Sequence, residues 1–155
     1  MTNMQPLTVL LAQTERQRDM ALADQMKAQS TSNAAQAQAE QLLAYRREYE
    51  QRWSAQFCRE GKIELVRCYQ GFMERLSQAV DSQVRAAAQA LAQLAEADTH
   101  VREHEVKVAA VRKLVERRIA EGHLQAERQD RKHDDELAAR VAWNRVGPVG
   151  RRNAA

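Results

Sequence analysis

Glycine and proline are almost absent from the first sixty residues, and this absence constrains the fold more than any other feature of the sequence. The only proline before Pro148 is Pro6, which can occupy the first turn of a helix, where its missing N–H costs nothing. The first glycine is Gly61. A helix of about 50 residues, about 75 Å long, can therefore occupy most of this segment.

The composition favours helices in the rest of the chain as well. Its commonest residues, Ala, Gln, Arg, Glu and Leu, are strong helix formers. Five glycines, two prolines and seven aromatic residues among 155 leave little material for turns, strands or a thick globular core. The sequence thus predicts an all-α fold.

The strongest pattern is a heptad repeat that begins at Val66. A run of this length is specific for a coiled-coil seam, which we expect to end near Ile119. The d positions, which start at Tyr69, are polar at three of eight places. The a positions are apolar in eight successive heptads: Val66, Met73, Val80, Ala87, Leu94, Val101, Val108 and Val115.

The first segment carries a weaker seam, because many of its residues are small. Burial of apolar surface stabilises by about 25 cal/mol per Å², and alanine buries little of it. We therefore expect the middle of this seam to be only marginally stable. The residues that repeat every seven are Leu7, Thr14, Ala21, Ala28, Ala35, Leu42 and Tyr49, with Leu10, Leu11, Ala39, Tyr45 and Trp53 alongside.

Two seams of similar length on either side of a glycine-bearing break predict a long antiparallel two-helix coiled coil, a helical hairpin, rather than a parallel dimer. We expect a single hairpin domain over residues 1–146, followed by a flexible tail at 147–155. Helix one should span about 5–57 and helix two about 63–143. The turn should lie at about 58–62, with Gly61 in the left-handed conformation.

The hairpin has a testable geometry at its turn. If the chain reverses between Glu60 and Gly61, residues whose numbers sum to about 121 lie level with each other. Some aromatic surface near the turn must then face outward, as a candidate for a partner's groove. The level pairs are Tyr49 with Phe72, Tyr45 with Leu76, Leu42 with Ala79, and Gln38 with Gln83.

Charge and motif content exclude several classes of function. Residues 1–60 carry seven basic and seven acidic residues, 61–119 ten and eight, and 120–155 seven and six, so no basic stripe predicts nucleic-acid binding. There is no phosphate-binding loop or nucleophile motif. We expect neither enzymatic activity nor a cofactor.

Metal, disulfide and membrane signals are equally weak. His100 and His104 lie four apart, but they provide only two metal ligands. Because His104 occupies a d position, we expect it to be a histidine of the seam. The cysteines Cys58 and Cys68 are expected to be reduced thiols. The apolar run at residues 7–12 is too short to span a membrane, so we expect a cytoplasmic protein without membrane insertion.

Three segments of the chain resemble the FliJ family of flagellar type III secretion components. They are Leu42-Leu43-Ala44-Tyr45-Arg46-Arg47-Glu48-Tyr49, Tyr69-Gln70-Gly71-Phe72-Met73-Glu74-Arg75-Leu76 and Arg131-Lys132-His133-Asp134-Asp135-Glu136-Leu137-Ala138. The block L-x-x-Y-x-x-x-Y, followed after a turn by Y-x-x-F-x-x-x-L, is the most specific part.

The resemblance implies a non-enzymatic stalk, inserted in the hexameric ring of the flagellar export ATPase at the cytoplasmic face of the export apparatus. It also implies binding to the export gate protein FlhA and to export chaperones. Carried over by position, the gate-binding surface falls on Gln38, Leu42, Tyr45, Tyr49, Phe72, Leu76, Ala79 and Gln83. For the ATPase ring, the implied contacts match by region only and are Arg16, Arg18, Arg128, Arg131, Lys132, Asp135 and Arg140.

Two other functions fit the same architecture. One is the equivalent stalk of a virulence type III injectisome, which gene neighbours would distinguish from a flagellar protein. The other is a generic scaffolding or nucleic-acid-associated coiled coil, which would show DNA binding that falls steeply with salt. The even charge distribution counts against the second.

Overall fold

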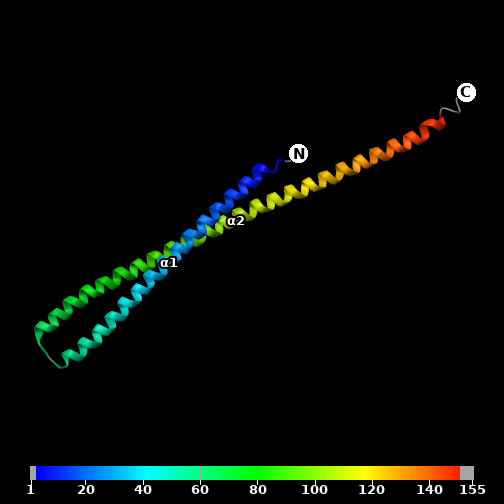
Figure 1. Cartoon of the computed structure of the whole chain (residues 1–155). Coiled ribbons are helices and arrows are strands. Elements are labelled where there is room, and N and C mark those ends of the chain that lie inside the picture. Colours follow the sequence, from blue (N-terminus) through cyan, green and yellow to red (C-terminus); the bar gives the residue numbers. More distant parts are fainter. Residues whose placement is uncertain (1–2, 60, 151–155) are drawn as a thin grey trace. The chain divides into compact units, whose positions relative to one another are not determined.

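Two long helices account for nearly all of the described chain. The computed structural model describes residues 3–59 and 61–150, the last four as backbone only. Helix α1 spans Gln5–Phe57 and helix α2 spans Ile63–Gly150 (Figure 1). The described residues contain no strand. The predicted all-α fold, with two helices packed against each other, is confirmed.

The ends of the helices differ from the prediction in two places. The C-terminal end of α2 lies at Gly150, beyond the expected end at Trp143. Residues 147–150, expected in a tail, are therefore helical, and residues 151–155 lie outside the described part of the chain. No described glycine has a positive φ, so the prediction of a left-handed Gly61 was wrong. Instead, the Arg59 N–H donates to the Gln56 carbonyl at 3.0 Å, which tightens the end of α1.

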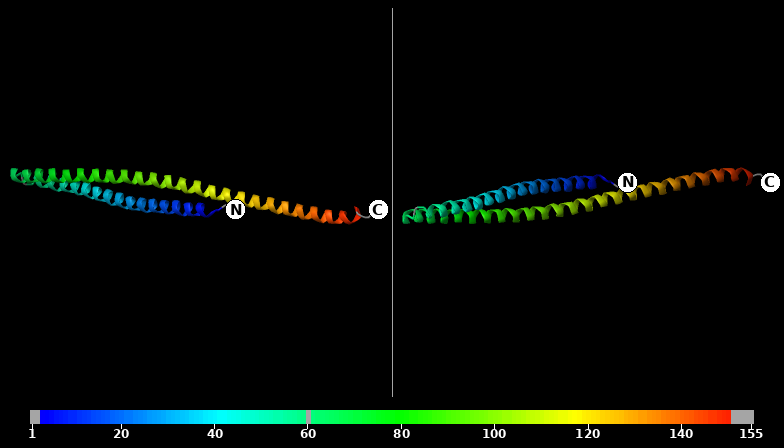
Figure 2. Two further views of the ribbon diagram at one scale, coloured as in Figure 1. Left: turned by 90° about the horizontal axis from the view of Figure 1, so that it is seen from above. Right: turned by 90° about the horizontal axis from the view of Figure 1, so that it is seen from below.

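The chain divides into two compact units, and each is described by itself. The larger unit comprises Glu15–Val106 and contains the turn. The smaller one comprises the two segments Met1–Thr14 and Lys107–Ala155. In both units, residues of α1 lie beside residues of α2, which runs in the opposite direction (Figure 2).

The predicted α2 seam is the core of the larger unit. Every a and d position from Val66 to Val101 is buried or half-buried, and only 2% of Val80 is exposed. The α1 residues in this core are small, so the two helices bury a narrow apolar strip. The buried positions are Ala21, Ser32 and Ala39 from α1, with Leu76, Val80, Ala87, Ala90, Leu94 and Val101 from α2.

Part of the α1 seam is polar, which explains its weak sequence signal. A second series of positions seven apart, Arg18, Gln25, Ser32, Ala39 and Arg46, is buried or half-buried, and four of its five members are polar. Polar residues of this kind are invisible to a search for apolar periodicity. One of them has a partner on the other helix, because the Gln25 Nε2 donates to Asp98 Oδ1 on α2 at 2.6 Å.

The smaller unit has a short seam and a long unpartnered segment. Leu7 and Leu11 of α1 are half-buried, while 2% of Val108 on α2 is exposed. The seam ends near Ile119, as expected. From there to Val146 every described residue is exposed except Gly122, which is half-buried. This segment of α2 therefore keeps its whole circumference available.

A matched pair of valines one helical turn apart tests the seam. Changing Val80→Ala removes buried apolar volume and should lower the free energy of unfolding by about 2 kcal/mol. Changing Val84→Ala, at a position that is 44% exposed, should change it by less than about 0.5 kcal/mol. Urea unfolding followed by circular dichroism measures both. Equal losses would contradict the assigned seam.

Candidate partner-binding surface

Aromatic side chains are concentrated next to the turn. Six of the seven aromatic residues of the chain lie between Tyr45 and Phe72. The rings of Tyr45 and Tyr49 have centroids 5.1 Å apart, and those of Tyr49 and Phe72 4.6 Å apart. Such tilted contacts stabilise by about 1 kcal/mol each beyond the area they bury. The Tyr49–Phe72 contact joins α1 to α2, as the level pairing predicts.

A second predicted pair is also formed. The Gln83 Nε2 on α2 donates to Gln38 Oε1 on α1 at 3.0 Å and lies 3.5 Å from the Ala35 carbonyl oxygen. Because Gln83 occupies a d position of the seam, its amide is a polar interruption that is satisfied across the two helices. The level rule is thereby confirmed at Tyr49–Phe72 and at Gln38–Gln83.

The eight residues of the predicted gate surface differ in how accessible they are. Leu76 is buried, with 8% exposed, so its side chain belongs to the seam and supports the surface from below. Tyr45 is 44% exposed. Gln38 and Ala79 are also exposed, whereas the half-buried members are Leu42, Tyr49, Phe72 and Gln83.

Four of these residues line one shallow groove. Its walls are Gln38, Leu42 and Tyr45 of α1 and Gln83 of α2, together with Gln41, which sequence reasoning missed. A signal was present, because Gln41 lies four residues before Tyr45 and so on the same side of the helix. The groove combines an aromatic ring, an aliphatic side chain and three amides, a mixture typical of surfaces that bind proteins.

The phenol of Tyr45 is held in its neutral form. Partial burial raises its pKa above the ordinary value of 10.0, and a hydrogen bond with the Tyr49 side chain raises it further. The nearby ion pair of Arg52 with Glu48, at 2.7 Å, is exposed. At neutral pH the aromatic part of the surface therefore carries no charge of its own.

The candidate ATPase contacts belong to both units. Arg16 and Arg18 lie in the larger unit, where half-buried Arg18 donates from Nη2 to Asp19 Oδ1 at 3.0 Å. In the smaller unit, the other five, Arg128, Arg131, Lys132, Asp135 and Arg140, are all exposed on α2.

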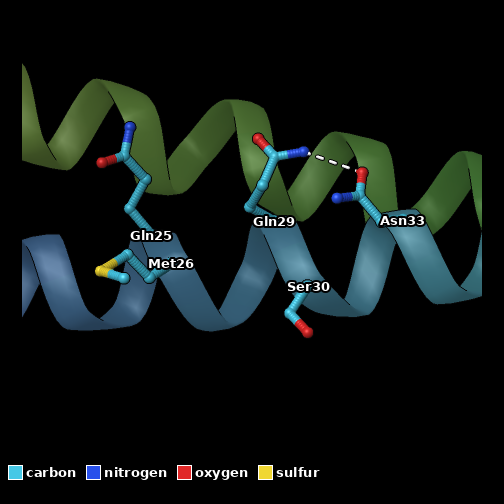
Figure 3. A pocket seen from close by; sticks show the side chains of 5 residues that line it. All are labelled: Gln25, Met26, Gln29, Ser30 and Asn33. Carbon is cyan, nitrogen blue, oxygen red and sulfur yellow. Dashed lines mark hydrogen bonds between the residues drawn. The ribbon is translucent and has the colours of Figure 1, made fainter.

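Another depression is lined by residues of α1 alone (Figure 3). Here the Gln29 Nε2 donates to Asn33 Oδ1 at 3.0 Å, and Met26 is 73% exposed. Its lining residues, Gln25, Met26, Gln29, Ser30 and Asn33, include no ionisable or nucleophilic group beyond a serine hydroxyl. This depression offers no catalytic constellation.

Histidine and cysteine side chains are scattered along the described chain. The described residues contain no group of three or more His, Cys, Asp or Glu side chains that could hold a metal ion. His100 Nδ1 lies 3.7 Å from Glu103 Oε2, and His104 is half-buried in the seam. Both cysteines are free and exposed. None of the described helices is sufficiently long and apolar to cross a membrane.

Comparison with known proteins gives one family. The family model described as flagellar FliJ protein matches residues 4–147. The chain belongs to the flagellar FliJ family. No curated protein and no solved structure matches it. As a FliJ-type protein, it is associated with flagellar type III export, interacts within the export apparatus, and belongs to a non-enzymatic family of export components.

The raised pKa of Tyr45 can be tested by titration. In protein labelled with ¹³C at the tyrosine ring, the Tyr45 resonance, assigned by its loss in Tyr45→Phe, should titrate with a pKa above the ordinary value of 10.0. In denaturant its pKa should return to about 10. The raised pKa means that folding favours the neutral phenol, so stability from this group is present below pH 10 and lost above the folded-state pKa. A midpoint that is the same in both states would contradict the arrangement.

Proposed function

We propose that this FliJ-type chain is a stalk of the flagellar export ATPase. One surface of the chain binds the export gate protein FlhA, and another enters the ring of the export ATPase. The chain works at the cytoplasmic face of the export apparatus, peripheral to the membrane, and also binds export chaperones. It performs no chemistry itself and couples ATP hydrolysis in the ring to events at the gate.

The aromatic surface beside the turn carries the gate-binding part of the proposal. It is built from both helices, and the Tyr49–Phe72 contact and the Gln38–Gln83 hydrogen bond join its two sides. Tyrosine at 44% exposure can bury a large ring at low entropic cost, which is why tyrosines dominate binding energy at many interfaces. The neighbouring groove gives a partner side chain a place to insert.

The ATPase part of the proposal is supported by the unpartnered segment of α2. Residues 123–146 are exposed all round, and five of the candidate contacts lie among them. An isolated helix gains little stability from its own propensity, so a segment this long is expected to be enclosed by a partner when it works. Of the five candidates, the basic residues can pair with acidic side chains of a partner and Asp135 with a basic one.

The family match supports the flagellar function over the injectisome alternative, because the matching family is described as flagellar. The match also disfavours the generic scaffold or nucleic-acid-associated coiled coil. The proposal therefore expects no nucleic acid among the partners.

Substitution of three aromatic rings tests the gate surface. Replacing Tyr45, Tyr49 and Phe72 with alanine should weaken binding to the FlhA cytoplasmic domain by about 100-fold or more, while helicity measured by circular dichroism stays nearly unchanged. Isothermal titration calorimetry gives the affinity. Binding to the ATPase should persist in this variant and serves as the control. An unaltered affinity for the FlhA cytoplasmic domain would contradict the assignment.

Charge reversal tests the ATPase contact. Changing Arg131→Glu and Lys132→Glu should reduce stimulation of the purified export ATPase and make the remaining binding less sensitive to salt. The double reversal of Lys113→Glu and Arg117→Glu, two exposed residues of α2 that are not among the candidates, changes the net charge by the same amount and is the control. Gate binding should be retained. If both reversals reduce stimulation equally, the effect is one of overall charge and the named contacts are wrong.

A further inference from the structure

Three aromatic residues beside the turn form a closed triangle that is not part of the proposed gate surface. The rings of Trp53 and Phe57 are 5.5 Å apart, those of Trp53 and Tyr69 5.4 Å, and those of Phe57 and Tyr69 5.1 Å. All three are half-buried. Two rings come from α1 and one from α2, so the triangle fastens the last turn of α1 to the first turns of α2.

The turn itself does little to align the helices. It occupies residues 58–62, and no described residue in it has a positive φ. A Cβ added to Gly61 would meet nothing within 4 Å. Close packing at Gly61 therefore does not fix the alignment of the two helices.

The seam supplies little alignment near the turn either. The last hydrogen bond between the helices before the turn joins Gln83 to Gln38, and among the described residues no hydrogen bond or ion pair joins α1 to α2 on the turn side of it. Flexible apolar side chains such as Met73 can pack in more than one register. Rings with a preferred mutual geometry are more selective.

We propose that the triangle of Trp53, Phe57 and Tyr69 is a positioning cluster that sets the register of the two helices at the gate-binding surface. This inference rests on the proposed function for its consequence. Trp53 is four residues from Tyr49 on α1, and Tyr69 is three residues from Phe72 on α2. Each is thus about one turn from the Tyr49–Phe72 contact. A slip of one residue would shift the facing positions by about 1.5 Å and rotate them by about 100°.

The register can be measured without any partner. Arg47 and Glu74 are exposed and level with each other, so spin labels at Arg47→Cys and Glu74→Cys, with Cys58 and Cys68 changed to serine, report the alignment. Changing Trp53, Phe57 and Tyr69 to leucine retains apolar side chains but removes the rings. The distance distribution should broaden or shift. The matched change Trp143→Leu, at a tryptophan that is 78% exposed, should leave it unaltered.

A cross-link separates positioning from direct contact with the partner. Cysteines at Trp53→Cys and Tyr69→Cys, again without Cys58 and Cys68, remove two rings of the triangle. One sample is joined with a short bis-maleimide, and the other has each thiol capped with N-ethylmaleimide. The capped protein should bind the gate domain about tenfold more weakly than the cysteine-free chain, and the cross-linked protein should recover most of the affinity.

The outcomes are distinguishable. An unchanged distance distribution in the leucine variant overturns the positioning role whether or not the gate protein binds. Equally weak binding of the capped and cross-linked samples shows that the rings contact the partner directly and also overturns it. If the unaltered chain fails to bind the gate domain, the proposed function fails, while the spin-label measurement still decides whether the triangle sets the register.

Discussion

The packing of branched α2 side chains against small α1 residues is the interaction on which the other features depend. Val80 and Val101 are almost completely buried against a strip that contains Ala21, Ser32 and Ala39. Two helices with one shared face cannot enclose a cavity, so every other face stays in contact with solvent or partners. In the larger unit, the aromatic face beside the turn is one of these available faces.

Because the seam is narrow, contacts other than apolar packing are needed to fix the alignment of the helices. Alanine contacts bury little area and discriminate weakly between registers. In the larger unit, hydrogen bonds between polar side chains add the missing discrimination between registers. They join Gln25 to Asp98 and Gln83 to Gln38. Since an unpaired buried amide is costly, each pair penalises a slipped register. Nearer the turn, rings replace amides, and the proposed gate surface is built where this change occurs.

Several elements of the site could be predicted from the sequence, because in a helical hairpin the position of the turn sets which residues face each other. Once the turn was placed near Gly61, antiparallel geometry set Tyr49 opposite Phe72 and Gln38 opposite Gln83, and both contacts are present. Gln41 was missed, because a neutral polar residue on an exposed face carries no periodic signal. The left-handed Gly61 was predicted wrongly, because the connection reverses the chain without a positive φ at this glycine.

The sequence by itself determined the helices, the α2 heptads and the end of the seam near Ile119, because these follow from local propensity and from periodicity along one chain. Only the tertiary structure decided which side chains are shared between the helices. It showed that Leu76 is seam while Tyr45 is surface, and that Arg18 and Ser32 belong to the seam. It also joined Trp53, Phe57 and Tyr69 into one cluster. The physical reason is that burial and ring contacts depend on the rotation of each helix about its axis, which a 3.5-residue repeat specifies only approximately.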